Sequence, residues 1–145
     1  KLQLQHLRKQ YGAKTAVDDV SVNLEPGVYG LLGANGAGKT TLMRMICGVL
    51  KPTSGSIRLN GKTIQTLGEQ YYTHLGYMPQ DFGFYPDFTA REFMLYMAAV
   101  KGMDKKVAKA RTEELLELVN LHDVAGKKIR SYSGGMKQRL AIAQA

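Results

Sequence analysis

The residues best suited to chemistry form one glycine-rich segment, which fits the phosphate-binding pattern G-x-x-x-x-G-K-[ST]. This segment, called the phosphate loop below, consists of Gly33, Ala34, Asn35, Gly36, Ala37, Gly38, Lys39 and Thr40. Its glycines allow the backbone to wrap closely enough for successive N–H groups to point at phosphate oxygens. Lys39 would reach the β and γ phosphates of a nucleotide, and the Thr40 hydroxyl would ligate Mg²⁺. The pattern therefore predicts a site for a nucleotide with bound Mg²⁺.

The elements around the phosphate loop agree with this interpretation, because the motif requires a strand before it and a helix after it. Residues 28–32 form a short apolar run, which predicts a strand buried on both faces. Residues 39–50 repeat apolar side chains at helical spacing, and Pro52 ends that pattern. The N-terminus of such a helix would add to the attraction for phosphate. The alternative is a glycine-rich turn with a surface lysine, which leaves this context unexplained.

Alternating apolar and polar residues indicate β structure in the first half of the chain. Such alternation occurs at residues 2–7, 20–24 and 57–59. The first two runs predict a pair of antiparallel strands. The pair Asn60 and Gly61 favours a tight hairpin, since both residues tolerate a positive φ angle. A further apolar run at residues 75–78 predicts another strand.

Three helices are predicted in the second half of the chain, and each begins at a residue that can cap it: Thr89, Asp104 or Ser133. Thr89 is followed three residues later by Glu92, which makes a capping box. The apolar face of the first helix is expected to contain Phe93, Met97 and Val100. The face of the second is expected to contain Val107, Arg111, Leu115, Leu118 and Val119. The face of the third is expected to contain Met136, Leu140 and Ala143.

Composition indicates a small globular domain with no membrane-spanning segment. The chain has 145 residues and a formal charge of +8. Its longest wholly apolar run is eight residues, whereas a spanning helix needs about 20. It begins without Met or a secretory signal, so we expect a fragment of a cytoplasmic protein. The single Cys47 is expected to be a small buried apolar group. Charge alone leaves nucleic acid, an anionic membrane surface and a phosphate ligand as alternatives.

Three further segments have the residue types and the order found in one known family. Tyr11 lies between the first two strands, where that family places an aromatic side chain that stacks on adenine. Gln80 follows the apolar run at residues 75–78, as the glutamine of the family's glutamine loop does. Residues 131–139 are similar to the family's signature, usually Leu-Ser-Gly-Gly-Gln, although Tyr132 and Met136 depart from it. The chain thus resembles the ATP-binding domain of ABC transporters over essentially its whole length.

The resemblance implies a set of ligand contacts. Contacts to ATP are expected from Tyr11, Gly33, Ala34, Asn35, Gly36, Ala37, Gly38, Lys39, Thr40, Thr41 and Gln80. Mg²⁺ is expected to bind Thr40 and Gln80. ATP held by a second domain is expected to contact Ser133, Gly134, Gly135 and Met136. Taken singly, Tyr11 can be a packing residue, Gln80 a polar loop residue and Ser133 the cap of an ordinary helix.

The family's hydrolytic groups follow its signature, and the resemblance implies that this chain lacks them. No apolar strand ending in paired acids occurs between Arg139 and Ala145, so no catalytic residue is expected within the chain. His6, His74 and His122 do not match the family's switch histidine and are expected to be surface or packing residues. The parent protein would be an ATPase. This chain is expected to bind ATP without hydrolysing it, and to self-associate through an unpaired strand.

The predicted fold class is α/β. It combines a P-loop NTPase core with an N-terminal antiparallel β portion and a helical subdomain, and its C-terminal part is expected to be missing. The β portion and phosphate-loop core are expected at residues 1–88, and the helical subdomain at residues 89–130. The signature segment and its helix are expected at residues 131–145.

The expected function is that of the ATP-binding subunit of an ABC transporter, which couples ATP binding and hydrolysis to transport. Its expected partners are a second ATP-binding domain and a transmembrane permease at the inner face of the cell membrane, with no nucleic acid. The permease is expected to dock near Phe82, Phe84, Tyr85 and Phe88, although core packing also explains these aromatic residues. The alternative is a soluble ABC-type ATPase acting on DNA or ribosomes. No sustained heptad repeat, typical of chromosome-associated members, separates the phosphate loop from the signature.

Overall fold

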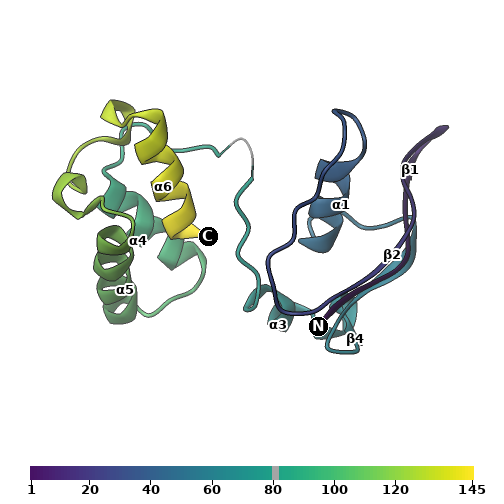
Figure 1. Ribbon diagram of the computed structural model, residues 1–145. Coiled ribbons are helices and arrows are strands. Elements are labelled where there is room, and N and C mark those ends of the chain that lie inside the picture. The colour runs from purple at the N-terminus through teal and green to yellow at the C-terminus, as the bar shows by residue number, and fades with distance from the viewer. Residues whose placement is uncertain (80–81) are drawn as a thin grey trace. The chain divides into compact units, whose positions relative to one another are not determined.

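A computed structural model describes residues 1–79 and 82–145, which form two compact units (Figure 1). The first, called the sheet unit below, contains residues 1–76, and the second, called the helical unit, contains residues 77–145. Each unit has its own group of buried apolar side chains. The divisions expected after residues 88 and 130 both fall inside the helical unit, because the last helix packs with the two helices before it.

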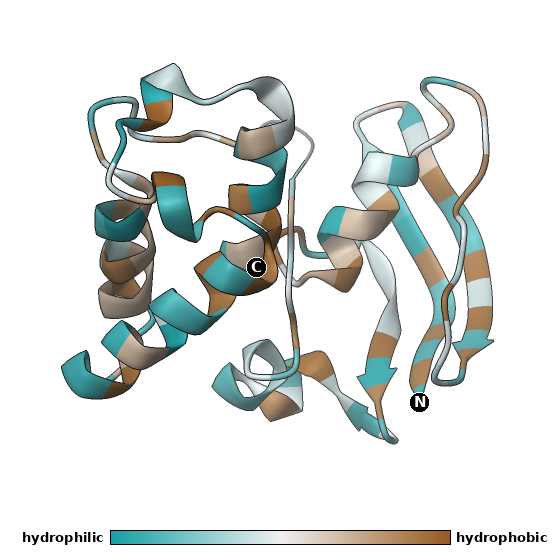
Figure 2. Ribbon diagram, turned by 60° about the vertical axis from the view of Figure 1, so that its left-hand side comes forward, coloured by the Kyte–Doolittle hydropathy of each residue, from teal (hydrophilic) through white to brown (hydrophobic). Residues whose placement is uncertain are grey.

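The sheet unit is built on four strands in the order β2-β1-β3-β4, and every neighbouring pair is antiparallel. The strands are β1 (Leu2–Tyr11), β2 (Lys14–Leu24), β3 (Ser54–Leu59) and β4 (Lys62–Thr63). Hydrophilic and hydrophobic residues alternate along them (Figure 2), as the sequence predicted. The antiparallel pair at the N-terminus is confirmed. The hairpin is confirmed too, with φ angles of 49° at Asn60 and 84° at Gly61.

Helix α1 (Lys39–Ile46) begins at the end of the phosphate loop and is shorter than the predicted residues 39–50. It ends early because Gly48 adopts a left-handed φ of 72°. The Gly48 N–H then donates to the Met45 carbonyl at 3.0 Å, which closes the last turn. Two short helices, α2 (Ile64–Leu67) and α3 (Glu69–Tyr72), complete the unit. Its buried core contains Leu4, Leu7, Val17, Met45, Ile57, Ile64 and Tyr71.

Two predicted strands are not formed, and both predictions are wrong. Residues 28–32 have no regular secondary structure, and Val28 and Leu32 are 102% and 92% exposed. Residues 75–78 are also irregular. A strand needs a neighbour whose C=O groups accept from its N–H groups and whose N–H groups donate to its C=O groups. The four-stranded sheet seen in the described residues offers neither run such a partner.

The helical unit contains three main helices, and their predicted caps are confirmed. These are α4 (Ala90–Val100), α5 (Lys105–Leu118) and α6 (Gly134–Gln144), with the short 3₁₀ helices η1 (His122–Val124) and η2 (Ile129–Ser131) between the last two. Thr89 and Glu92 form a complete capping box at α4. The buried core contains Ala90, Phe93, Met94, Leu116, Leu121, Ala125, Ile129, Tyr132, Leu140 and Ala143. No helix in the two described ranges has both the length and the apolar character needed to cross a membrane.

The buried face of α5 differs from the predicted one. Val107 and Leu118 are 56% and 75% exposed, whereas Ala108, Thr112 and Leu116 are buried. Leu115 and Val119 of the predicted face are partly buried and pack against the core, so the buried face lies about one residue along from the predicted one. Val100 of α4 is also exposed, at 65%. The face predicted for α6 is correct, since its leucine and alanine are buried and its methionine is partly buried.

Candidate functional site

The phosphate loop leads into α1 through two glycines with left-handed backbone angles. Gly36 has a φ of 85° and Gly38 a φ of 88°. Gly38 is the N-cap of α1, so no side chain accepts a hydrogen bond from the first N–H groups of the helix. The first turn also contains no acidic residue. The start of α1 therefore offers uncompensated N–H groups and positive potential, as anion binding requires.

Contact with β2 fixes the position of Gly38. The pairing of β1 with β2 skips from Val17 to Thr15, which leaves Ala16 as the extra residue of a bulge. A Cβ atom at Gly38 would lie 2.1 Å from the Ala16 carbonyl oxygen. Only glycine can approach the strand so closely, and the bulge therefore sets where the helix begins.

The Lys39 side chain folds back onto the loop that precedes it. Its Nζ donates hydrogen bonds to the carbonyl oxygens of Gly33 at 2.6 Å and Ala34 at 2.7 Å. Lys39 is partly buried, whereas Thr40 and the loop residues 33–37 are exposed. The ammonium group is thus held within the loop, and the threonine hydroxyl is open to a ligand at the first turn of α1. Thr41, also expected to contact ATP, is the third residue of that helix and is partly buried.

Tyr11 lies at the same end of the sheet as the phosphate loop. It is the last residue of β1, pairs with Lys14 of β2, and is 50% exposed. Ala16, which contacts Gly38, is two residues further along β2, or about 7 Å in an extended strand. An exposed aromatic ring and the start of α1 are therefore brought together by the first two strands.

The signature segment begins α6. The Ser133 hydroxyl accepts a hydrogen bond from the Met136 N–H at 3.2 Å, and Ser133, Gly134 and Gly135 are all exposed. The two departures from the family pattern have structural roles. Tyr132 is buried and donates its hydroxyl hydrogen to the Val124 carbonyl at 2.8 Å, and burial raises the pKa of that hydroxyl. Met136 packs against the core of the helical unit, where a polar glutamine would be unsuited.

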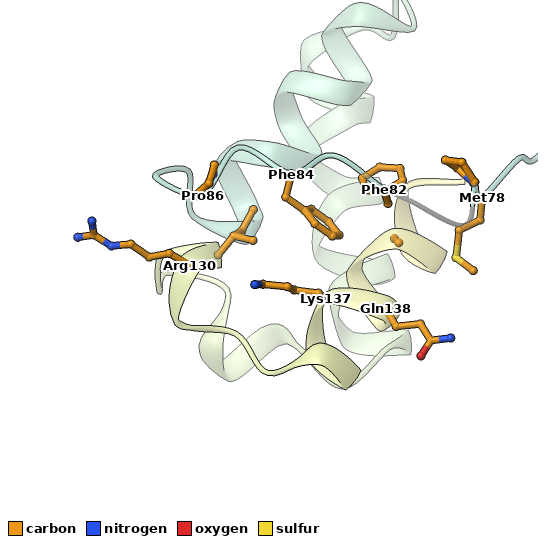
Figure 3. Close-up of a pocket in the computed structure, with 10 residues that line it drawn as sticks. Met78, Phe82, Phe84, Pro86, Arg130, Lys137 and Gln138 are labelled. Carbon is orange, nitrogen blue, oxygen red and sulfur yellow. The ribbon is translucent and has the colours of Figure 1, made fainter.

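Gln80, expected to contact ATP and Mg²⁺, lies outside the residues that the structure describes. Next to it in the sequence, the helical unit contains an apolar groove of about 640 Å³ (Figure 3). Figure 3 shows the Lys137 side chain extending beneath the ring of Phe84, while Arg130 points away from the groove. The residues that line it are Met78, Pro79, Phe82, Phe84, Pro86, Ile129, Arg130, Lys137, Gln138 and Ala141.

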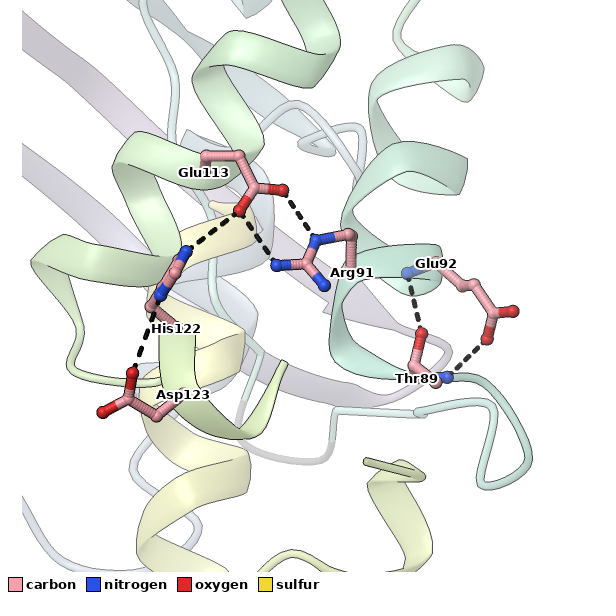
Figure 4. A network of polar contacts seen from close by, with 6 residues as sticks. All are labelled: Thr89, Arg91, Glu92, Glu113, His122 and Asp123. Carbon is pink, nitrogen blue, oxygen red and sulfur yellow. Dashed lines mark hydrogen bonds and ion pairs between the residues drawn. The ribbon is translucent and has the colours of Figure 1, made fainter. Parts of the chain in front are cut away.

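Sequence reasoning did not predict an ion-pair network at the start of α4 (Figure 4). Arg91 donates two hydrogen bonds to the carboxylate of Glu113, at 2.6 Å and 3.0 Å. These bonds lower the pKa of Glu113 and raise that of Arg91. His122 lies 3.4 Å from the same carboxylate. The arginine and the glutamate are 22 residues apart and on different helices, so no local pattern could have paired them.

Acidic and histidine side chains are also candidate metal ligands. Among the residues that the structure describes, no group of three or more His, Cys, Asp or Glu side chains has metal-binding geometry. Histidines instead pair with carboxylates, and His122 lies near two of them, Glu113 at 3.4 Å and Asp123 at 3.7 Å. His6 Nδ1 lies 2.7 Å from Asp19 on the exposed surface of the sheet.

Comparison with known proteins agrees with this geometry. A family model described as ABC transporter matches residues 17–145, a range that contains both the phosphate loop and the signature. The chain belongs to the ABC transporter family. The resemblance seen in the sequence is thereby confirmed.

Individual relatives match nearly the whole of this chain. It is 44% identical to the uncharacterised ABC transporter ATP-binding protein YxlF of Bacillus subtilis, over 99% of this chain and 48% of that protein. It is 42% identical to the bacitracin transport ATP-binding protein BcrA of Bacillus licheniformis, over 96% of this chain and 45% of that protein. The chain thus spans about half the length of the curated relatives it matches.

A solved structure of the ATP-binding subunit of an ABC transporter superposes on the fold with a TM-score of 0.76. The two sequences are 27% identical, over 99% of this chain and 60% of that one. The predicted α/β P-loop NTPase class, with an antiparallel sheet and a helical portion, is therefore confirmed. The relationship also supports ATP as the nucleotide of this ABC transporter family member.

Proposed function

We propose that this chain is the nucleotide-binding part of an ATPase that drives transport through a membrane permease. The observation that carries the proposal is the start of α1. There the phosphate loop leaves N–H groups without a side-chain cap, with Lys39 on one side and the open hydroxyl of Thr40 on the other. A polyphosphate fits these groups, because the N–H groups and the Thr40 hydroxyl can donate hydrogen bonds to its oxygens and the Lys39 ammonium balances its negative charge.

Each part of the loop has a role in binding ATP. The backbone N–H groups of residues 34–39 would surround the β phosphate, and Lys39 would exchange its two carbonyl acceptors for phosphate oxygens. Thr40 and Gln80 would hold Mg²⁺, which would neutralise charge on the β and γ phosphates. The exposed ring of Tyr11 would stack on the adenine base.

Two such domains would enclose the nucleotide together. Ser133, Gly134 and Gly135 are exposed at the start of α6, where N–H groups and a hydroxyl can meet an anion. Their contact with ATP bound to a second copy would close the pair. Closure would then depend on bound nucleotide, since the signature contacts a nucleotide that the other domain already holds.

The chain alone is proposed to bind ATP without hydrolysing it. A water-activating base must be a free carboxylate or imidazole that can accept a proton. In the helical unit, for example, Glu113 is already bound to Arg91, which lowers its pKa and makes it a poor proton acceptor. We expect phosphate release from ATP to equal that of the Lys39→Ala variant. Release clearly above this control would show a base that the motif does not supply.

The permease is proposed to dock on the helical unit at the groove of Figure 3 and the aromatic side chains beside it. Tyr85 and Tyr96 are 47% and 42% exposed there, and such residues are enriched in interfaces. The direction of transport is proposed to be export. The Nod factor export ATP-binding protein I of Paraburkholderia xenovorans, 40% identical, and the linearmycin resistance ATP-binding protein LnrL of Bacillus subtilis, 39% identical, have names that describe export or resistance.

The deciding experiment is calorimetric titration of MgATP into the chain and into two lysine variants. Lys39→Ala should weaken binding at least tenfold, because a charge-assisted hydrogen bond contributes about 1.5–3 kcal/mol. Lys62→Ala removes the same charge from the exposed hairpin of β4 and should leave affinity unchanged. Equal affinities for all three proteins would remove Lys39 from this role.

A further inference from the structure

Lys9 and Tyr11 are two residues apart on β1, and their side chains meet at the end of that strand. The Lys9 ammonium lies 5.2 Å from the centroid of the Tyr11 ring. An ammonium within about 6 Å of a ring centroid is attracted by the negative potential of the ring face. The contact is not a chance orientation of a long surface side chain, because Lys9 is partly buried and its ammonium has a second, fixed partner.

That partner is in the segment that follows α1. Lys9 Nζ donates a hydrogen bond to the Lys51 carbonyl at 2.8 Å. Two more bonds tie the same part of β1 to this segment. Thr53 N–H donates to the Arg8 carbonyl at 2.8 Å, and the Gln10 N–H donates to the Thr53 hydroxyl at 3.1 Å. The end of β1 is therefore anchored to the chain that leaves the helix of the phosphate loop.

We propose that Lys9 is a positioning residue for Tyr11 in nucleotide binding. This inference rests on the proposed role of Tyr11 as the surface on which the base stacks. The Lys51 carbonyl fixes the Lys9 ammonium, and the ammonium occupies one face of the tyrosine ring. The opposite face is left for the base. The ligand assigned to this face is the purine of a nucleotide, because a flat π system is what an aromatic ring with one covered face can still accept.

Two physical effects give Lys9 its influence. The ammonium limits the rotation of the Tyr11 side chain, so less conformational freedom is lost when the base arrives. Its positive charge also lies behind the ring, where it attracts the electron-rich purine through the tyrosine. Neither effect acts on the phosphates. Lys9 should therefore change the affinity for ATP without changing the affinity for a polyphosphate that has no base.

The test uses the whole chain, titrated with MgATP and with Mg²⁺-tripolyphosphate as the ligand without a base. Lys9→Met keeps the length of the side chain but removes the charge and the hydrogen-bond donor. It should weaken ATP binding by about threefold, within the range of a partly exposed cation–π contact, and leave tripolyphosphate binding unchanged. Lys9→Arg keeps a cation that can reach both partners and should restore ATP affinity.

A double variant separates positioning from a general effect of charge. With Tyr11→Ala already in place, adding Lys9→Met should cause no further loss of ATP affinity. Lys14→Met is the matched control, because Lys14 is the residue of β2 that pairs with Tyr11. Any change that it causes should be equal for ATP and tripolyphosphate.

The outcomes that would overturn the inference are distinct from those that concern Tyr11. Equal weakening of ATP and tripolyphosphate by Lys9→Met would make Lys9 a general phosphate-attracting charge. An unchanged ATP affinity in Lys9→Met, together with a loss in Tyr11→Ala, would leave the stacking role intact and remove Lys9 from it. Unchanged ATP affinity in Tyr11→Ala would instead refute the base-stacking role, and the inference about Lys9 with it.

Discussion

Residues 28–32, before the phosphate loop, and residues 82–88, before α4, are both rich in large apolar side chains. In the first segment, Val28 and Leu32 are almost wholly exposed. In the second, all three phenylalanines are partly buried and pack against the core of the helical unit. The sequence predicted a buried strand for the first segment, and for the second it left both a docking surface and core packing open.

Neighbouring residues explain the burial of the second segment. The rings of Phe82 and Phe84 lie 5.9 Å and 5.5 Å from the ring of Phe93 in α4. The backbone is held as well, because the Ile129 N–H donates to the Phe88 carbonyl at 2.9 Å. The aromatic side chains thus extend a core that the helices have already formed.

The first segment has no comparable support within the described residues. Its polar contacts are local, since the Tyr29 hydroxyl donates to the Glu25 carbonyl at 3.0 Å and accepts from the Glu25 N–H at 3.1 Å. Such a turn gives Val28 and Leu32 nothing to pack against. Apolar character therefore shows that burial is favourable, but burial occurs only where another element supplies the opposing surface.

The largest effect is expected from removing the ring on which the aromatic segment packs. Phe93 is 1% exposed, and Phe93→Ala should lower the free energy of unfolding by about 3–5 kcal/mol through lost burial and an internal cavity. Urea denaturation followed by circular dichroism measures this. Leu32→Ala is the matched control from the other segment and should change stability by less than about 0.5 kcal/mol. Similar losses in the two variants would contradict the comparison.

A smaller effect is expected at the start of α4, which follows the aromatic segment. The Thr89 hydroxyl accepts from the Glu92 N–H at 3.1 Å, and Thr89→Ala should cost about 1 kcal/mol of stability. Thr89→Ser keeps the hydroxyl acceptor and should therefore retain most of the stability that Thr89→Ala loses. ATP affinity in both variants should match that of the unchanged chain, because Thr89 caps α4 and is not part of the phosphate loop. An unchanged unfolding midpoint in Thr89→Ala would show that the capping box adds nothing here.

The ion pair of Figure 4 should contribute less, and its contribution should depend on pH. Arg91 and Glu113 are 39% and 33% exposed, so screening by solvent limits the loss in Glu113→Gln to about 0.5–1 kcal/mol at pH 7. The arginine lowers the pKa of Glu113 from its ordinary value of 4.5. The stabilisation should therefore be complete above pH 4.5 and disappear as the pH falls below it. Glu117→Gln, at an exposed position of α5, is the control for carboxylate loss. Thermal melts from pH 3 to pH 7 measure the stability difference between Glu113→Gln and the unchanged chain, and a difference that did not narrow at low pH would contradict this prediction.

The smallest effect on stability is expected at the exposed segment, where the change should appear in self-association. Leu32→Ser should leave the unfolding midpoint unchanged, because the side chain is 92% exposed. It should reduce the average mass measured by light scattering, since it removes part of an exposed apolar patch. Leu118→Ser removes an exposed leucine, 75% accessible, from the helical unit and should have no such effect. Equal masses for Leu32→Ser and the unchanged chain would contradict a role of the segment in association.

The features that the sequence predicted correctly are those that few neighbouring residues determine. Asn60 and Gly61 tolerate the angles of a tight turn, and Thr89 and Glu92 satisfy each other's backbone groups across three residues. The phosphate loop depends in the same way on glycine angles and on the start of a helix. Such features require no distant partner, so residue type and spacing were sufficient to locate the candidate site.

Tertiary structure decided the features that depend on elements far apart in the chain. The face that α5 buries is set by its packing with α4 and α6, and the pairing of Arg91 with Glu113 likewise joins two helices. The support of Tyr11 by Lys9 requires the carbonyl of Lys51, which is 42 residues away from Lys9 in sequence. A hydrogen bond or a buried contact forms only when both partners are brought within a few ångströms. The periodicity of one segment contains no information about which distant segment will supply its partner.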